Sequence, residues 1–368
     1  MNIALDARFY GTEHTGLGRY TTNVMAHLPQ ALSAQAGLQG LTLKVLLRKK
    51  YYDTLKLPSN CEKILCDIPH YSLAEQILLP HVLHTMNCEL LYTFHFNVPL
   101  SNTLPTVVTV HDLIKSHFTG ADTTTRSPWL FTLKRFGYNR VIHHTLTHAT
   151  AIVTPTNTVK NDILALFPTV KPELIHPIPE APDPIFQKVS KSEIRNPKLP
   201  TKYFLFVGNA YPHKNLAVLL DALIQLPHEH LVIVAKLTPF LTRLLSARDR
   251  SRIHILSNLT DSELVSVYAH AKALITPSLM EGYGLPGLEA MMVGTPVIAS
   301  NIPVYREVYG DKVTYFDPRS VSGLIDVIKN SNFKTRISNF SFTRSWSDVA
   351  HDIAEVINAS CTRLRSAQ

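Results

Sequence analysis

A long hydrophobic run is missing from this sequence. None of its apolar stretches reaches the roughly 18 consecutive residues that a membrane-spanning helix needs. The start of the chain, residues 1–6, alternates like a first strand and lacks the basic and apolar regions of a secretory signal. We therefore expect a cytoplasmic protein, and a peripheral position at the inner face of a membrane stays open.

Metal-binding and disulfide patterns are also missing. The four cysteines, Cys61, Cys66, Cys88 and Cys361, form no Cys-x-x-Cys pair, and no cluster of cysteine and histidine has the spacing of a zinc finger. The sequence also has no Asp-x-Asp string of the kind that indicates a manganese site. We expect four reduced thiols and no metal site.

Acidic residues are fewer than basic ones. The chain has 36 Lys and Arg residues against 28 Asp and Glu residues, a net charge of +8. A basic surface attracts nucleic acid, anionic lipid or a phosphorylated substrate. The basic residues are scattered and form no arginine-rich tail, so nucleic acid is not expected as a partner.

The sequence does contain a regular alternation of short apolar runs and helix-like stretches. A chain of 368 residues is too long for one compact core and fits two domains. The alternation predicts an α/β fold in which helices cover parallel sheets. The predicted strands of the first series are residues 2–6, 41–47, 90–92, 106–110 and 151–154, and those of the second are 203–207, 231–235, 253–256, 273–276 and 296–299.

A proline-rich segment separates the two series. Residues 176–184 include four prolines, and proline fixes φ and lacks an N–H, so neither a helix nor a central strand is expected there. We predict a first domain over residues 1–176, a linker over 177–200 and a second domain over 201–345. A C-terminal helix follows over 346–368, and its expected place is against the first domain.

Two helix-like segments of the first domain, residues 71–83 and 129–144, mix aromatic and basic residues. Their large side chains, such as Trp129, Phe131 and Phe136, are expected in the core by default. A substrate groove and a membrane surface stay open as alternatives.

The nine residues from Glu281 to Glu289, Glu-Gly-Tyr-Gly-Leu-Pro-Gly-Leu-Glu, follow a predicted strand. Pro286 suits the first turn of a helix, and Gly294 is placed to end it. A helix N-terminus presents free N–H groups and a partial positive charge, and glycines let an anion approach the backbone. The segment therefore predicts a phosphate site, with Glu289 in the first turn facing a ribose and Glu281 facing a sugar.

This string resembles the donor-site motif of family 4 glycosyltransferases, whose signature is two glutamates separated by seven residues. The resemblance implies the GT-B fold, in which two Rossmann-like domains place their parallel sheets on either side of a central cleft. It also implies retention at the anomeric carbon. No metal ion or other cofactor is then required, and a nucleoside-diphosphate sugar is the donor substrate.

The resemblance extends to loops elsewhere in the chain. It implies catalytic roles for His111, Lys214 and Glu281, with Lys214 neutralising the donor diphosphate. Asn209 stands where the family commonly has an arginine, so another basic group or a helix N-terminus must compensate. The implied donor-binding residues are Gly16, Gly18, Gly208, Asn209, Lys214, Leu256, Gly282, Tyr283, Gly284, Leu285, Pro286 and Glu289.

The strings at residues 280–286 and 294–301 look most like those of bacterial mannosyltransferases of cell-surface polysaccharide assembly. We therefore favour GDP-mannose as the donor, with a UDP-sugar as the alternative, and a saccharide or lipid-linked acceptor. Two other functions stay open. They are a non-catalytic nucleotide-sugar-binding scaffold and a sugar-phosphate synthase or phosphorylase on the same fold.

Overall fold

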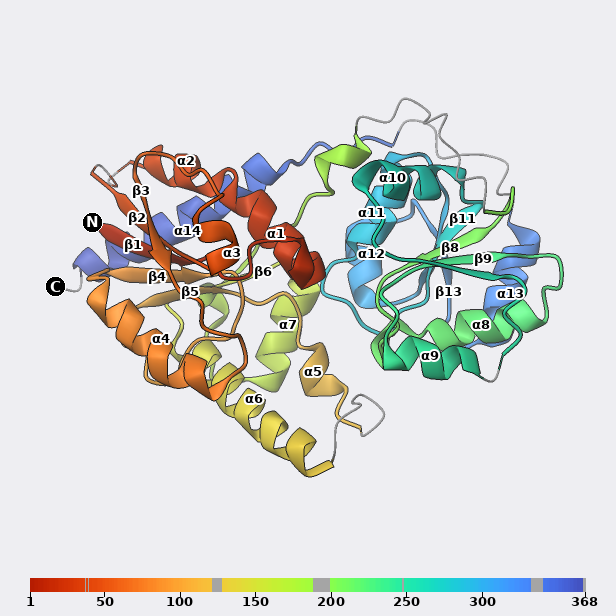
Figure 1. The fold of residues 1–368 in the computed structure, drawn as a ribbon, viewed down its shortest axis with the longest axis horizontal. Coiled ribbons are helices and arrows are strands. Elements are labelled where there is room, and N and C mark those ends of the chain that lie inside the picture. Colours follow the sequence, from red (N-terminus) through yellow and green to blue (C-terminus); the bar gives the residue numbers. More distant parts are fainter. Residues whose placement is uncertain are drawn as a thin grey trace. The chain divides into compact units, whose positions relative to one another are not determined.

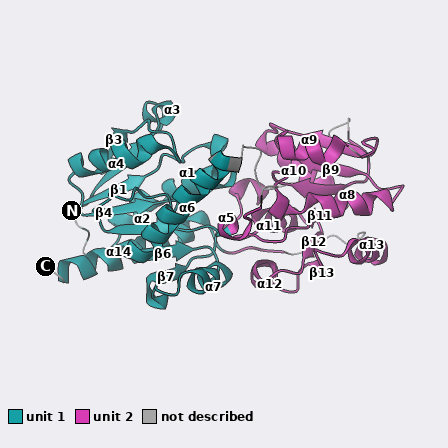
Figure 2. Cartoon of the chain, turned by 90° about the horizontal axis from the view of Figure 1, so that it is seen from below, with its two compact units in different colours: residues 1–113, 129–180, 344–368 teal, residues 114–128, 181–343 magenta. Residues whose placement is uncertain are grey.

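The computed structural model divides the chain into two compact units (Figure 1 and Figure 2). Unit 1 consists of residues 1–113, 129–180 and 344–368, and unit 2 consists of residues 114–128 and 181–343. The structure describes residues 1–36, 38, 40–120, 128–187, 199–246, 248–331 and 340–366. The predicted linker, residues 177–200, therefore lies partly outside the described residues.

Unit 1 is built on a seven-stranded parallel sheet with the order β3-β2-β1-β4-β5-β6-β7. Its strands are β1 (Asn2–Asp6), β2 (Thr42–Leu47), β3 (Cys61–Leu65), β4 (Leu90–Thr93), β5 (Thr106–Thr109), β6 (Ala151–Thr154) and β7 (Ile175–Pro177). All five strands predicted for the first series are confirmed. The two that were not predicted, β3 and β7, are the edge strands, which are only partly buried and lack a continuous apolar run.

Helices cover both faces of this sheet. In Figure 1, α1, α2 and α14 lie on one face, and α4, α6 and α7 lie on the other. The helices of unit 1 are α1 (Thr15–Met25), α2 (Leu28–Ser33), α3 (Lys49–Tyr52), α4 (Leu73–Thr85), α6 (Pro128–His148), α7 (Asn157–Leu166) and α14 (Trp346–Ser366). The C-terminal helix α14 packs on α1 and α2, which belong to the same unit.

The proline-rich segment contains regular structure that the sequence did not predict. It begins inside strand β7, which pairs with β6 through Ile175 and Pro177. Proline is tolerated there because β7 is an edge strand, where a missing N–H leaves no ladder bond unmade. A short 3-10 turn follows at Pro184–Phe186, with Phe186 buried in unit 2.

The expected burial of Trp129 and Phe136 is wrong. Their side chains are 70% and 63% exposed, although the second half of the same helix, α6, packs on the sheet through Ile142 and Leu146. The 21 residues of α6 span about 31 Å at 1.5 Å per residue, whereas strands of four residues span only about 13 Å. The first half of α6 therefore extends past the end of the sheet that buries the second half.

Unit 2 contains a six-stranded parallel sheet with the order β10-β9-β8-β11-β12-β13. Its strands are β8 (Phe204–Val207), β9 (Leu231–Val234), β10 (Ile253–Leu256), β11 (Ala273–Thr276), β12 (Val297–Ser300) and β13 (Thr314–Phe316). Only β13, again at an edge, was not predicted. The two parallel sheets confirm the predicted α/β class.

The helices of unit 2 lie in two layers, one on each face of its sheet. One apolar cluster joins the sheet to α8 (Leu216–Ile224), α9 (Pro239–Ser246) and α13 (Val321–Asn330). The other joins it to α10 (Asp261–His270), α11 (Leu285–Met292) and α12 (Pro303–Tyr309). A separate short helix, α5 (Ile114–His117), also belongs to unit 2.

The four cysteines are free, and burial raises the pKa of each thiol to about 11. They are therefore protonated and weakly nucleophilic at neutral pH. Within the described part of the chain, no helix is both long and apolar enough to cross a membrane.

Candidate active site

The loops after β8 and β11 carry the strongest group of candidate residues in unit 2. Gly208 follows β8 at φ 137°, a conformation that favours glycine, and a 3-10 turn at Pro212–Lys214 comes next. Asn215 then takes a left-handed conformation, and its side-chain amide donates to the carbonyl oxygens of Pro277 at 3.0 Å and Pro318 at 2.8 Å. This asparagine fixes three loops together and was not singled out from the sequence.

Lys214 and Glu281 form an ion pair across these loops. Lys214 Nζ donates to Glu281 Oε1 at 2.6 Å, and their side chains are 21% and 12% exposed. The same carboxylate oxygen accepts hydrogen bonds from the Ser278 hydroxyl at 2.7 Å and the Tyr305 hydroxyl at 3.2 Å. The structure thus brings together two of the three predicted catalytic residues and adds Ser278 and Tyr305, which sequence reasoning missed.

The charge state of Glu281 follows from these contacts. Burial by itself raises the pKa of Glu281. The charge and hydrogen bond of Lys214, together with the Ser278 hydroxyl, lower the pKa by more than burial raises it, so it lies below its ordinary value. Glu281 is therefore ionised at neutral pH. Among the described residues, none donates a hydrogen bond to its second oxygen, Oε2.

The glycines of the 281–289 string have a structural reason that the sequence did not reveal. Gly284 caps α11 at φ 109°, and a Cβ there would lie 2.5 Å from the Tyr309 hydroxyl. A Cβ on Gly287 would lie 2.4 Å from the same side chain. Tyr309 stacks on Tyr305 with ring centroids 4.9 Å apart and donates to the Gly284 carbonyl at 2.5 Å. These glycines therefore leave space for the side chains of Tyr305 and Tyr309. The sequence alone explains them only by the close approach of a phosphate.

One further detail of this string needs correction. Glu289 is not in the first turn of α11 but is its fifth residue; it is buried and accepts a hydrogen bond from Tyr268 at 2.6 Å. The difference arises because the helix starts only at Leu285, so its first turn ends before Glu289. Tyr283 is 7% exposed and packs in the apolar core, and its role toward the donor stays a prediction.

The other donor residues predicted in the second domain lie in the same unit. Pro286 is the second residue of α11, as expected for the first turn, and no side chain caps this helix. Gly294 follows the helix at φ 77° and ends it as predicted. Leu256, the last residue of β10, and Leu285, the first residue of α11, pack partly on the core, while Asn209 and Gly282 are partly buried in their loops.

The third predicted catalytic residue, His111, lies in unit 1 just after β5. Its Nε2 is 3.0 Å from the carbonyl oxygen of Phe94, and its Nδ1 is 3.2 Å from Glu180 Oε1. Burial lowers the pKa of His111, but the hydrogen bond and charge of Glu180 raise it more, so the pKa is above its ordinary value. Since both neighbours accept hydrogen bonds, they favour the imidazolium form of the ring. Glu180 lies in the proline-rich segment and was not predicted.

The glycine-rich loop of unit 1 lies at the start of α1. A Cβ on Gly18 would lie 1.8 Å from the carbonyl oxygen of Gly11, so close packing of the helix on a turn explains this glycine. A Cβ on Gly16 would meet no atom within 4 Å. Gly16 is exposed, and its predicted role toward the donor stays a prediction.

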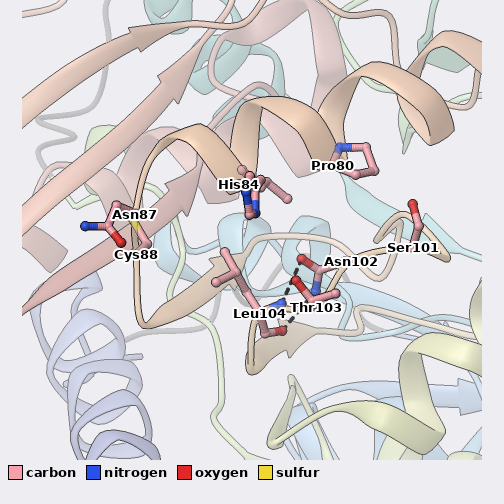
Figure 3. Close-up of a pocket in the computed structure, with 9 residues that line it drawn as sticks. Pro80, His84, Asn87, Cys88, Ser101, Asn102, Thr103 and Leu104 are labelled. Carbon is pink, nitrogen blue, oxygen red and sulfur yellow. Dashed lines mark hydrogen bonds between the residues drawn. The ribbon is translucent and has the colours of Figure 1, made fainter.

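Figure 3 shows a pocket of about 160 Å³ in unit 1, away from these residues. It lies at the amino ends of the strands, since Cys88 precedes β4 and Leu104 precedes β5. Ligands of parallel sheets bind beyond the carboxyl ends, so we assign this pocket no part in the site. Among the described residues, no group of three His, Cys, Asp or Glu side chains is placed to hold a metal ion.

Parts of this sequence match known proteins. Residues 188–340, which lie wholly within unit 2, match the family model described as glycosyl transferases group 1. The match covers less than half of the chain, and it shows that unit 2 contains a region similar to this family. The chain is 26% identical to the O-antigen chain mannosyltransferase RfbU of Salmonella typhimurium over 363 residues, which cover 94% of this chain and 97% of that protein. It is 29% identical over 200 residues to the O-antigen chain mannosyltransferase B of Escherichia coli, covering 50% and 51%.

Solved structures resemble this chain over its whole length. WaaG, a glycosyltransferase involved in lipopolysaccharide biosynthesis, matches with a TM-score of 0.65 and 17% identity, covering 97% of this chain and 98% of that one. Sucrose-phosphate synthase from Thermosynechococcus elongatus matches with a TM-score of 0.70 and 16% identity over the full length of both chains. At this identity the likeness shows the fold, and it confirms the predicted two-domain GT-B class.

Proposed function

We propose that this protein transfers a hexose, with mannose favoured, from a nucleoside-diphosphate sugar to a saccharide or lipid-linked acceptor in cell-surface glycan synthesis. The observation that carries the proposal is the ionised Glu281 carboxylate, which is anchored through one oxygen by Lys214, Ser278 and Tyr305. The two O-antigen mannosyltransferases among its relatives support mannose, and hence GDP-mannose, over the alternative of a UDP-sugar.

Glu281 is suited to hold the donor sugar. Because Oε1 already accepts three hydrogen bonds, Oε2 is the oxygen that accepts bonds from sugar hydroxyls in this proposal. Its negative charge also favours the oxocarbenium-like sugar that forms as the bond to phosphate loosens. Transfer then proceeds with retention at the anomeric carbon.

Lys214 is suited to hold the departing diphosphate. Its ammonium group has three N–H donors, and Glu281 is its only hydrogen-bond partner among the described residues. The other donors are directed to the diphosphate in this proposal, together with the uncapped N-terminus of α11. The helix N-terminus takes the place of the arginine that Asn209 replaces, and no metal ion or other cofactor takes part.

The acceptor side of the proposal is assigned to unit 1. His111 is kept in its predicted catalytic role as an imidazolium oriented by Glu180. A lipid-linked acceptor implies that the enzyme works in peripheral contact with a membrane at the cytoplasmic face.

The test is release of nucleoside diphosphate from a panel of nucleotide sugars, with and without added divalent metal, in the presence of saccharide acceptors. We expect GDP-mannose to be used without metal. Glu281→Gln preserves the size of the side chain and removes its charge, and we expect kcat to fall about 100-fold or more. Donor binding without any transfer would indicate a scaffold, and dependence on free phosphate or a phosphorylated acceptor would indicate the phosphorylase or synthase alternative.

A further inference from the structure

Helix α6 presents apolar side chains on a face that no described residue of unit 1 covers. Trp129, Leu133 and Phe136 are 70%, 60% and 63% exposed. Their spacing of four and three residues places them in one stripe along the helix. The opposite side of α6 carries Val141 and Ile142, which are buried against the sheet. A surface helix of a globular protein normally has a single apolar face, so the exposed stripe needs another explanation.

The stripe belongs to a stretch of sequence that contains cations and no carboxylates. Residues 123–161 of the sequence contain no Asp or Glu at all. Lys134 and Arg135 lie within the striped half of the helix, and Arg140 follows one turn after Phe136. The Arg140 guanidinium is 6.0 Å from the centroid of the Phe136 ring, so a cation stands directly beside the apolar surface. Apolar side chains flanked by cations, with a tryptophan among them, match the boundary of an anionic lipid layer.

The start of α4 carries further exposed apolar side chains. Leu73, Ile77 and Leu78 are 82%, 71% and 52% exposed, and α4 covers the same face of the sheet as α6 (Figure 1). Tyr71, two residues before α4, packs on His95 with ring centroids 5.7 Å apart, and the next residue, Phe96, packs on Tyr138 of α6 at 5.5 Å, so both helices contact the loop after β4. The one acidic residue of α4, Glu75, is fully buried and paired with Arg8.

We infer that the first halves of α4 and α6 dock unit 1 on an anionic phospholipid surface. The aliphatic and aromatic side chains enter the boundary between headgroups and acyl chains, and Lys134 and Arg140 contact the headgroup phosphates. The inference extends the proposed function, in which the acceptor is lipid-linked. Docking itself requires neither a donor nor sugar transfer.

The experiment is co-sedimentation of the full chain with vesicles of phosphatidylcholine alone or of phosphatidylcholine with phosphatidylglycerol, without nucleotide sugar. We expect binding to the anionic vesicles that weakens with salt. Trp129 is one of two tryptophans, and the other, Trp346, is buried. Fluorescence emission should therefore shift to shorter wavelength on binding, as Trp129 leaves water.

Matched variants show whether binding depends on the α6 stripe or on any exposed apolar side chain. Leu133→Ser with Phe136→Ser should abolish binding, and Lys134→Gln with Arg140→Gln should weaken it by roughly fivefold for each cation removed. The control is Ile224→Ser with Leu237→Ser in unit 2, where the two aliphatic side chains are 64% and 68% exposed. All six side chains are exposed in whole or large part, so the variants should keep the unfolding temperature of the parent.

Several results would overturn the inference. They are no binding to anionic vesicles, equal binding to both vesicle types, and equal loss in the stripe and control variants. Light scattering is the remaining check. The inference would also be wrong if the parent protein were a dimer that does not bind vesicles and the stripe variant were a monomer. The stripe would then bind a second copy of the chain. Donor binding is measured separately by calorimetry without vesicles, so failure of the proposed function and failure of docking are distinguishable.

Discussion

Nδ1 of His111 lies 3.2 Å from Oε1 of Glu180, although 69 positions separate the two residues in the chain. The pair joins the loop after β5 to the proline-rich segment at the boundary of unit 1. With the Phe94 carbonyl on its other nitrogen, the imidazole is held in one orientation, and its protonated form is favoured. Glu180 is therefore a positioning residue for the predicted catalytic histidine.

Glu180→Gln should make the stability of the protein less dependent on pH near neutrality. The folded-state pKa of His111 is raised, so its contribution is fully present below its unfolded pKa and is lost as pH rises through the folded pKa. We expect the variant to lose about 1.5–3 kcal/mol on the acid side of that window and less on the alkaline side. Urea unfolding across a pH series measures this difference. In a His111→Gln background the same substitution should have little effect on the pH dependence, and a full effect there would contradict the pairing.

Lys214→Gln should weaken nucleoside-diphosphate binding and also change acid stability. The folded-state pKa of Glu281 is lowered, so the stabilisation is present above its unfolded pKa and is lost as pH falls through the folded pKa. We expect a loss of about 1–3 kcal/mol at neutral pH that shrinks on acidification. Calorimetry with GDP and unfolding at each pH are the measurements. Lys202→Gln, at an exposed lysine of the same unit, is the control and should change neither.

Gly287→Ala and Gly284→Ala should both destabilise unit 2, but for different reasons. At Gly287 the added Cβ meets Tyr309, which we expect to cost about 1–3 kcal/mol. In a double-mutant cycle with Tyr309→Leu, most of that cost should disappear. Gly284 also has a φ of 109°, which strains any residue with a side chain, so its cost should remain in the Tyr309→Leu background. Equal rescue at both glycines would show that the backbone conformation of Gly284 is not limiting.

Glu289→Gln and Tyr268→Phe separate the predicted ribose contact from a structural role. Tyr268 donates to the buried Glu289 carboxylate at 2.6 Å. Removing the hydroxyl leaves that carboxylate without one donor, so Tyr268→Phe should cost about 1–3 kcal/mol of stability. Glu289→Gln keeps an oxygen acceptor and should cost less, but we expect it to raise the Kd for GDP about tenfold, or ~1.4 kcal/mol. An unchanged Kd would contradict the ribose contact and show that Glu289 only links α11 to α10 through Tyr268.

The central strands of both sheets were predictable because they are continuous apolar runs. Strands β3, β7 and β13 were not, because an edge strand with one exposed face has a weaker pattern, and Pro177 argued against a strand at β7. The burial of Trp129 and Phe136 was mispredicted for a related reason. Periodicity shows which residues share a helix face, but the length of the sheet beneath decides how much of that face is covered.

The site was predictable as a set of loops but not as a set of contacts. Glu281 and Lys214 were both singled out, yet their 2.6 Å pair depends on two loops 67 positions apart. Ser278 and Tyr305 bond to Glu281 but belong to no recognisable string, and a tyrosine 24 residues away carries no local signal. The glycines at 284 and 287 were found correctly, but the tyrosines that require them lie in the next helix.

The chain leaves unit 1 for the second time after residue 180 and returns to it at residue 344, so α14 packs on α1 and α2, which lie more than 300 positions earlier in the sequence. During synthesis, unit 2 is therefore complete before unit 1. The apolar residues of α14, such as Trp346 beside Tyr20 and the fully buried Ile353, reach the ribosome exit only after all of unit 2. Until they emerge, the layer formed by α1 and α2 is exposed to aggregation and to chaperones.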